Sequence, residues 1–168
     1  GSYNVDATPA VRSWTVLESG SNLIGNPGFE VDTSGWKGEV AANTLTRVAG
    51  GHSGGWAAEV SNTVAGGACG LDDKPSWVGL TQAGTYTVGI WARSDTPGLT
   101  LRLRVREYVS GVQQGSVSTL VTLTSSWQQV TRAYTPIAPG QSSLDVEAFT
   151  ANSPVGVCFQ ADDASITH

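Results

Sequence analysis

Residues 99–109 read LTLRLRVREYV, and apolar and charged side chains alternate along this stretch. Alternation with a period of two is the pattern of a β-strand with one face in a core and the other in solvent. The buried face would carry Leu101, Leu103 and Val105. The solvated face would carry three arginines and a tyrosine: Arg102, Arg104, Arg106 and Tyr108. The stretch therefore predicts a strand of a sheet with one solvated face.

Other stretches alternate in the same way. Residues 85–94 read TYTVGIWARS, and residues 143–150 read SLDVEAFT. Their solvated faces would carry aromatic and charged side chains: Trp91, Arg93, Asp145, Glu147 and Phe149. Further strands are expected at 44–49, 56–62, 76–82, 116–123, 127–136 and 156–167. Because these short runs are separated by clusters of Gly, Pro, Ser and Asp, the sequence predicts an all-β protein, either an antiparallel β-sandwich or a jelly roll.

The composition favours this class and excludes others. Only 14% of the 168 residues are charged, and the chain has 21 Gly and 7 Pro, which disfavour long helices. No apolar run approaches the roughly 20 residues that a membrane helix needs, so we expect no membrane partner. The net charge is −5 and there are only two lysines, which argues against nucleic acid as a partner.

The two cysteines, Cys69 and Cys158, are far apart in the sequence. Two cysteines cannot form a four-cysteine zinc site, and a disulfide that joins distant parts of the chain is our interpretation. Two buried free thiols are the alternative. A disulfide would place the protein outside the cytosol, so we expect a secreted protein.

The chain divides near residue 21. Residues 11–16 read VRSWTV and predict a strand, which a short linker follows. This opening resembles the last strand of immunoglobulin-like repeats in large bacterial secreted proteins. We expect a terminal strand and linker from an upstream module at 1–21, partly docked through Trp14 and Val16, and a β-sandwich domain at 22–168.

Residues suited to catalysis are scarce. His168 is the last residue, His52 lies in a Gly-rich turn, and there is no G-x-S-x-G motif. Asp145 and Glu147 would place two carboxylates on one strand face. Pairing with arginines across the sheet is the simpler explanation of these carboxylates. We therefore expect no enzymatic activity.

A solvated sheet face with aromatic and charged side chains suits sugars. An aromatic ring stacks on the C–H face of a pyranose, while charged and amide groups hydrogen-bond its hydroxyls. Trp91, Tyr108 and Phe149 are the aromatic candidates for such a face. Exposed aromatic clusters are otherwise unfavourable, so the pattern indicates a binding face.

The arginines at 102, 104 and 106 have two interpretations. In the first, they neutralise acidic residues: Asp145, Glu147 and Glu107. In the second, they select an acidic polysaccharide, because Arg binds carboxylates through two parallel hydrogen bonds. The sequence leaves both open.

Five motifs occur in series along the chain. They are NLIGNPGFE with SGW (22–36), HSGGWAAEV (52–60), TYTVGIWARSDTPG (85–98), SSWQQVTRAYTPIAP (125–139) and FQADDASIT (159–167). Together they resemble carbohydrate-binding modules of families 4 and 9, with family 22 as a close relative. The resemblance implies a jelly-roll sandwich that binds polysaccharide and is attached to a glycoside hydrolase or lyase.

The resemblance also implies a structural Ca²⁺ ion near the two ends of the domain. By position in the motifs, Glu30 and Asp162 would bind it through their side chains, and backbone carbonyls near Gly28 and His52 would complete the set. Asp163 is the alternative if the strand alternates the other way, and in a second alternative Glu30 and Asp162 are buried and hydrogen-bonded without a metal. Two carboxylates with several carbonyl oxygens suit calcium, which takes six to eight oxygen ligands.

We therefore expect a non-catalytic carbohydrate-binding module of a multidomain protein, monomeric and attached to a catalytic domain. Its partner would be a polysaccharide or oligosaccharide, with acidic sugars as one option. Seven residues are expected to bind the ligand: Trp91, Arg102, Arg104, Arg106, Tyr108, Glu147 and Trp77. For Trp77, a place in the core is the alternative. A spacer or adhesin-like β-sandwich that does not bind sugar is the alternative function.

Overall fold

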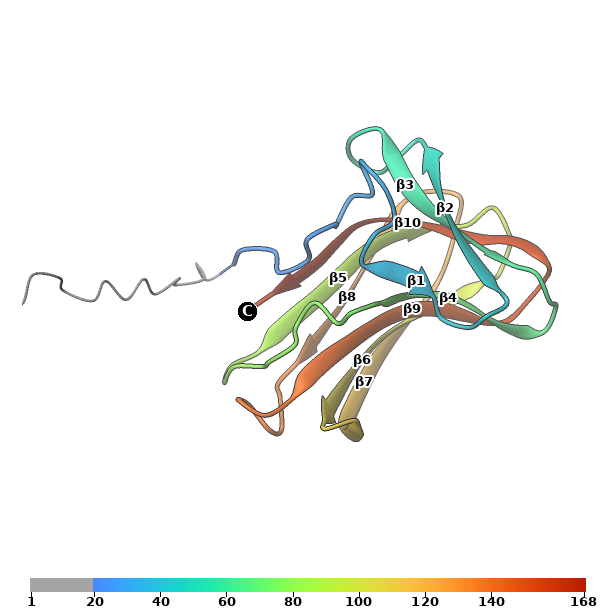
Figure 1. Ribbon diagram of the computed structural model, residues 1–168. Helices are drawn as coiled ribbons and strands as arrows, with labels where there is room; N and C mark the ends of the chain where they lie inside the picture. The colour runs from blue at the N-terminus through green and yellow to red at the C-terminus, as the bar shows by residue number, and fades with distance from the viewer. Residues whose placement is uncertain (1–19) are drawn as a thin grey trace, which may run out of the picture.

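Two antiparallel sheets of five strands each face one another in the computed structural model, which describes residues 20–168 (Figure 1). The first sheet contains, in spatial order, β1 (Trp36–Gly38), β4 (Gly67–Asp73), β9 (Ser143–Ser153), β6 (Thr100–Val109) and β7 (Val112–Thr122). The second sheet contains β2 (Asn43–Ala49), β3 (Trp56–Asn62), β10 (Gly156–Thr167), β5 (Tyr86–Arg93) and β8 (Gln128–Tyr134). The predicted all-β sandwich is confirmed, and its strand order is consistent with a jelly roll.

The core lies between the sheets, and the alternating strands supply it as predicted. Leu101, Leu103 and Val105 of β6 are at most 1% exposed. The inward side chains of β9 and β5 are buried as well: Leu144, Val146, Ala148, Tyr86, Val88, Ile90 and Ala92. Each of these strands therefore presents its remaining side chains to the outer face of its sheet.

A disulfide between Cys69 of β4 and Cys158 of β10 joins the two sheets. Both cysteines are fully buried. The predicted pairing is thus confirmed, and it closes a loop with a sequence separation of 89 residues. A crosslink of that span stabilises a fold by about 4 kcal/mol, through the entropy that it removes from the unfolded chain.

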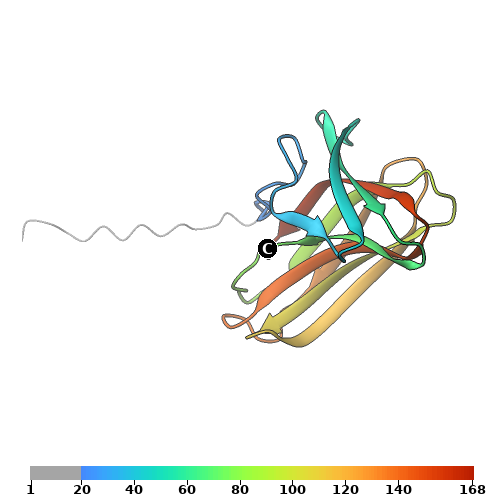
Figure 2. The ribbon, with the colours of Figure 1, turned by 45° about the vertical axis from the view of Figure 1, so that its right-hand side comes forward.

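The chain enters and leaves the domain side by side. The Leu23 amide donates to the Ile166 carbonyl at 2.8 Å, and Asn22 accepts from the Ile166 amide at 3.0 Å. Figure 2 shows the first described residues next to the C-terminal end of β10. The terminal strand predicted with Trp14 and Val16 lies outside the described residues.

The predicted strand at 76–82 is wrong. Only Val78 of this stretch forms a bridge, to Leu144, and the edge of the first sheet is built instead by β4 and β1. Pro75 has no N–H for a ladder, and the Trp77 amide donates to the side chain of Asp73 rather than to a strand. Gly-rich β4 pairs with β9 despite its weak strand propensity, because this pairing buries Leu71 completely.

No helix among residues 20–168 has the length and apolar character needed to span a membrane.

Candidate functional site

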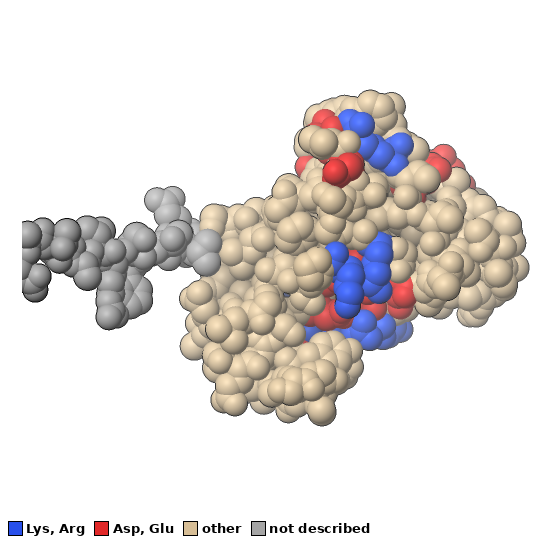
Figure 3. Space-filling model, in the orientation of Figure 1, with Lys and Arg blue, Asp and Glu red and all other residues tan. Residues whose placement is uncertain are grey.

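The outer face of the first sheet carries a set of charged and aromatic side chains, which we call the charged face. It consists of Asp72 of β4, Asp145, Glu147 and Phe149 of β9, and Arg102, Arg104, Arg106 and Tyr108 of β6. The register places Glu147 beside Arg104 and Phe149 beside Arg102. Figure 3 shows basic and acidic side chains gathered in one place over β9 and β6.

Two of the three arginines form ion pairs across the sheet. The Arg106 guanidinium lies 2.7 Å from Asp145 and 2.9 Å from Glu147, and Arg104 also pairs with Glu147. The side chain of Glu147 is only 1% exposed. A buried carboxylate needs such partners, because an unpaired buried charge is costly. The predicted pairing of Arg104 and Arg106 with acidic residues is therefore present.

Arg102 differs from the other two arginines. Among the described residues it has no carboxylate partner, and its guanidinium lies 5.8 Å from the centre of the Phe149 ring. Both side chains line a hollow of about 440 Å³, together with Leu120 and the Pro97–Thr100 turn. Arg102 is thus positioned to donate hydrogen bonds to a molecule in this hollow.

Phe149 depends on the glycine beside it. Gly70 is the register partner of Phe149 on β4. A side chain at Gly70 would collide with the Cβ atom of Phe149 and would begin 2.8 Å from the Ala148 carbonyl oxygen. Glycine at this position therefore lets the Phe149 ring lie over the sheet, where the Arg104 guanidinium is 4.7 Å from its centre.

Tyr108 provides a second aromatic ring, at the other end of β6. The Arg106 guanidinium lies 5.7 Å from the centre of this ring, and Tyr108 is in register with Ser143 of β9. The charged face therefore has an aromatic group near each end and fixed charges between them.

The edge of this face is strongly acidic. Ligand atoms of Asp72, Asp73 and Asp145 lie within 4.8 Å of one another, and these three carboxylates could hold a metal ion. Burial raises the pKa of Asp73 to about 7, and repulsion from the two other aspartates acts in the same direction. Lys37 partly neutralises the cluster through a 2.6 Å ion pair with Asp72. Sequence reasoning missed this cluster, because it placed no strand at 67–73.

The residues expected to bind calcium come together around the loop between β2 and β3. Asp162 accepts hydrogen bonds from the amides of His52 (2.7 Å) and Ser53 (3.2 Å). Glu30 accepts from the amides of Gly55 (3.1 Å) and Trp56 (3.2 Å). Two carboxylates from opposite ends of the domain thus hold the same loop.

This loop also forms a cradle of oxygen atoms at Gly51. The point where a side chain of Gly51 would begin is 2.6 Å from the Ser53 carbonyl and 2.8 Å from the Asp162 carboxylate. The Trp56 carbonyl is closer still. Carboxylate and carbonyl oxygens are the ligands that calcium takes. Gly28 lies against the same carboxylate, so oxygen atoms of the kind that a calcium site needs gather around this loop.

Asp163 contacts the side chains of the same two residues whose amides donate to Asp162. It lies 2.6 Å from His52 Nδ1 and accepts from the Ser53 hydroxyl, also at 2.6 Å. A bulge in β10 between Asp162 and Ser165 turns these two successive aspartates toward the same loop. Side chains of β10 therefore do not alternate between the two faces at this point. Such alternation was the condition under which Asp163 would replace Asp162 as a calcium ligand.

We expected Trp91 on the same face as the arginines, but the structure places it elsewhere. It belongs to β5 of the second sheet, and the His52 ring stacks on it with 3.7 Å between ring centres. Alternation determines which side of a strand faces the core, but it does not determine which sheet the strand joins. Trp91 is therefore separated from the charged face by the core.

Trp77 lies at the edge of the core. Its ring centre is 6.3 Å from that of Trp36, and Gly25 and Gly35 leave room for it. A side chain at Gly25 would begin 2.8 Å from the Trp77 ring. This packing corresponds to a place for Trp77 in the core and not to a place in the ligand-binding face.

A two-layer jelly-roll sandwich with a solvated face of aromatic and charged side chains is typical of binding modules rather than enzymes. The sequence of residues 21–154 matches the family described as "Carbohydrate binding domain", CBM_4_9. The chain belongs to this family and is a non-catalytic carbohydrate-binding module. Among curated proteins, none shows significant sequence similarity to the chain.

Solved structures of similar fold include carbohydrate-binding modules. The CBM22-1 xylan-binding domain of Paenibacillus barcinonensis Xyn10C has a TM-score of 0.69 and 15% identity, with 90% of this chain and 97% of that chain covered. TmCBM61, solved with β-1,4-galactotriose, has a TM-score of 0.61 and 21% identity, with coverages of 88% and 99%.

A third similar structure contains an attached catalytic module. It is the CBM22-1–GH10 portion of the Clostridium thermocellum xylanase Xyn10B, complexed with xylohexaose. The TM-score is 0.66 at 21% identity, over 84% of this chain. This chain spans 28% of that xylanase chain and 26% of an α-L-arabinofuranosidase chain that it also matches.

Proposed function

We propose that a polysaccharide binds across the charged face, with one sugar ring stacked on Phe149 and a carboxylate-bearing sugar paired with Arg102. The observation that carries the proposal is the difference between the three arginines. Arg104 and Arg106 are occupied by acidic partners, whereas Arg102 faces the hollow beside Phe149 and has no acidic partner among residues 20–168. A guanidinium in that position is a strong donor to a carboxylate.

The paired residues would have a different role. Glu147 holds Arg104 and Arg106 in fixed orientations, so the remaining donors of the two guanidinium groups are preorganised for sugar hydroxyls. Tyr108 would stack on a second ring of the same polysaccharide. Binding would then cost little side-chain entropy on the part of the protein.

Affinity electrophoresis tests this proposal. Gels would contain xylan, β-1,4-galactan or polygalacturonate, and retention would be compared between the wild type and Arg102→Ala. We expect polygalacturonate to retain the wild type, and Arg102→Ala to weaken the affinity about 10- to 100-fold, since a charge-assisted hydrogen bond contributes about 1.5–3 kcal/mol.

Lys74→Ala is the matched control. Lys74 is exposed and comes just after β4, so this variant loses one positive charge without removing a residue of the charged face. Retention of Lys74→Ala should equal that of the wild type. Equal retention of the wild type and Arg102→Ala on polygalacturonate would contradict the assignment of Arg102. Absence of retention on all three gels would favour a spacer without sugar binding.

A structural calcium ion at the β2–β3 loop is the second part of the proposal. Glu30 and Asp162 would hold it with carbonyl oxygens of Ser53 and Trp56, and with those near Gly28 and His52. The ion would supply positive charge to the two carboxylates. The oxygen cradle at Gly51 supports this placement.

Thermal unfolding with and without a chelator tests the calcium site. We expect EDTA to lower the Tm of the wild type, because an ion that binds only the folded state stabilises it. Asp162→Asn should remove this dependence, while Asp145→Asn, in the other acidic cluster, should keep it. If EDTA left the Tm of the wild type unchanged, the calcium site would be wrong.

We also propose that the module acts as a monomer, is secreted and is joined to a glycoside hydrolase or lyase that it directs to polysaccharide. The buried disulfide supports an oxidising compartment. The similar module of Xyn10B, solved together with its GH10 module, supports the attachment. Detection of the protein in the culture medium, and not in the cytosol, would be the expected result of fractionation.

A further inference from the structure

A second hollow lies on the opposite side of the molecule, on the outer face of the second sheet. Its volume is about 280 Å³, and it is lined by side chains of β3, β5 and β10 and by the start of the loop after β5. This volume is near the lower end of the range of about 300–1,000 Å³ that is usual for small-molecule sites. A hollow of this size suits one sugar ring rather than a run of rings.

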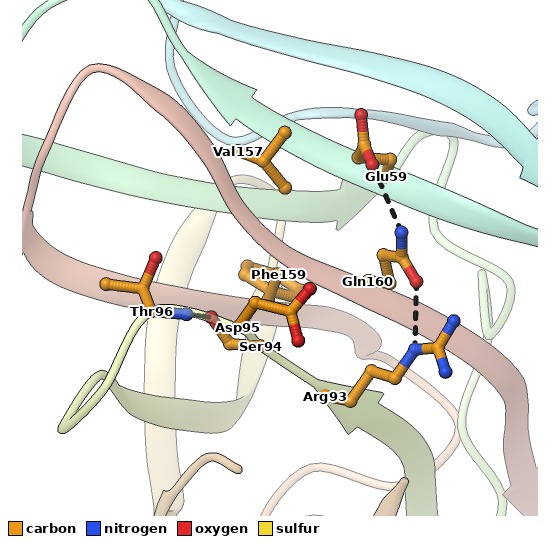
Figure 4. Close-up of a pocket in the computed structure, with 8 residues that line it drawn as sticks. All are labelled: Glu59, Arg93, Ser94, Asp95, Thr96, Val157, Phe159 and Gln160. Carbon is orange, nitrogen blue, oxygen red and sulfur yellow. Dashed lines mark hydrogen bonds between the residues drawn. The ribbon is translucent and has the colours of Figure 1, made fainter. Parts of the chain in front are cut away.

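One wall of this hollow is a row of side chains that fix one another. Glu59, Gln160 and Arg93 are register partners on three neighbouring strands. Arg93 donates to the Gln160 amide oxygen at 2.9 Å, and the Gln160 amide nitrogen donates to Glu59 at 3.1 Å. Figure 4 shows these three side chains in line. The row is therefore held in place without a ligand.

The row still has free hydrogen-bonding capacity. Arg93 uses Nε and Nη2, which leaves the donors of Nη1, and Glu59 uses Oε2, which leaves Oε1 as an acceptor. Asp95 lies across the hollow and forms no ion pair or hydrogen bond with another described residue. Donors and acceptors therefore face the hollow from two sides.

The remaining lining combines two polar residues, Ser94 and Thr96, with two apolar ones, Val157 and Phe159. Phe159 lies between the row and the 94–96 segment in Figure 4, but its ring is fully buried in the core, so Val157, which is 48% exposed at the rim, is the apolar side chain that a ligand can reach. An exposed apolar side chain, Val157, beside carboxylate, amide and guanidinium groups suits a sugar, which has C–H faces and a rim of hydroxyls. Two carboxylates against one guanidinium give the hollow a negative charge, which disfavours uronates.

We propose that this hollow binds a single uncharged sugar residue, as a second saccharide site independent of the charged face. The inference goes beyond the proposed function, because the core separates the two sites. The loop between β5 and β6 lies between them: Asp95 faces this hollow, and Pro97–Thr100 line the hollow of Arg102. Two sites on opposite faces would allow one module to hold two polysaccharide chains.

Backbone-amide NMR shifts on titration with millimolar D-xylose, D-galactose or D-glucose test the second site. We expect at least one of these sugars to shift the amides at 93–96 and 157–160. Val157→Trp, which would fill the hollow, and Asp95→Ala, at an exposed position, should abolish these shifts. Arg102→Ala should leave them unchanged.

The outcomes separate this site from the charged face. The same titration is repeated with an oligosaccharide of the polysaccharide that retains the protein in gels. Shifts confined to β6 and β9 would overturn the second site and leave the proposed function intact. Shifts confined to 93–96 and 157–160 would support the second site and contradict binding at the charged face. No shift with any sugar, or shifts at 93–96 that persist in both Val157→Trp and Asp95→Ala, would also overturn the second site.

Discussion

Glu107 of β6 points into the core, on the side opposite to the arginines, and is fully buried. It accepts hydrogen bonds from the Tyr134 hydroxyl at 2.6 Å and from the amides of Ile137 and Ala138 at 2.8 Å each. It therefore does not neutralise the arginines, although its position in the sequence suggested this. Burial alone would raise the pKa of Glu107, but these hydrogen bonds and one with Ser142 lower it to about 2.

Glu107→Gln should lower the free energy of unfolding by about 3 kcal/mol at neutral pH, because an amide cannot accept all of these bonds. The pKa of Glu107 is lower in the folded state than its ordinary value of 4.5. Its stabilising effect is therefore present above about pH 4.5 and is lost as the pH falls toward 2. Urea unfolding at several pH values checks this. A difference between wild type and variant that stayed constant down to pH 2 would contradict it.

Gly70→Ala should destabilise the protein by about 1–3 kcal/mol, the usual cost of overpacking. The added methyl group would collide with Phe149 and with the backbone of Ala148. Gly79→Ala is the matched control, because nothing lies within 4 Å of a side chain there. Thermal unfolding of both variants gives the comparison. Equal Tm values would show that Phe149 does not need a glycine beside it.

At the scale of elements, alternation of side chains is a reliable guide where it is strong. The faces of β5, β6 and β9 follow directly from it, since Leu and Val at every second position leave one arrangement that buries them. The Gly-rich β4 has no such pattern, and its strand forms through pairing with β9 and burial of Leu71. Local sequence cannot reveal a strand whose stability comes from partners distant in the chain.

The candidate site is also predictable from the sequence only in part. The outward position of Arg102, Arg104 and Arg106 follows from a single strand. The partners of these arginines cannot be predicted from that strand. They depend on the register between two strands about 40 residues apart, which brings Glu147 to two arginines and Phe149 beside Arg102. For the same reason, Trp91 could be placed outward but not assigned to a sheet.

At the scale of the whole molecule, the disulfide is the covalent link between the layers. The double variant Cys69→Ala/Cys158→Ala should lose about 4 kcal/mol of stability. Reduced and alkylated wild-type protein should show a similar loss, which separates the crosslink from the packing of two alanines. Urea unfolding at neutral pH measures both. A loss well below 1 kcal/mol in both samples would mean that the sheets are held together without the bond.

The central claim is that the charged face is the polysaccharide site. Isothermal titration calorimetry tests it most directly, with an oligosaccharide of whichever polysaccharide retains the protein in gels. Phe149→Ala should weaken binding at least about tenfold, or about 1.4 kcal/mol, through the loss of stacking. Trp56→Ala, which removes an exposed aromatic ring on the second sheet, should bind like the wild type. Unchanged affinity of Phe149→Ala, with affinity lost in Trp56→Ala, would contradict the account.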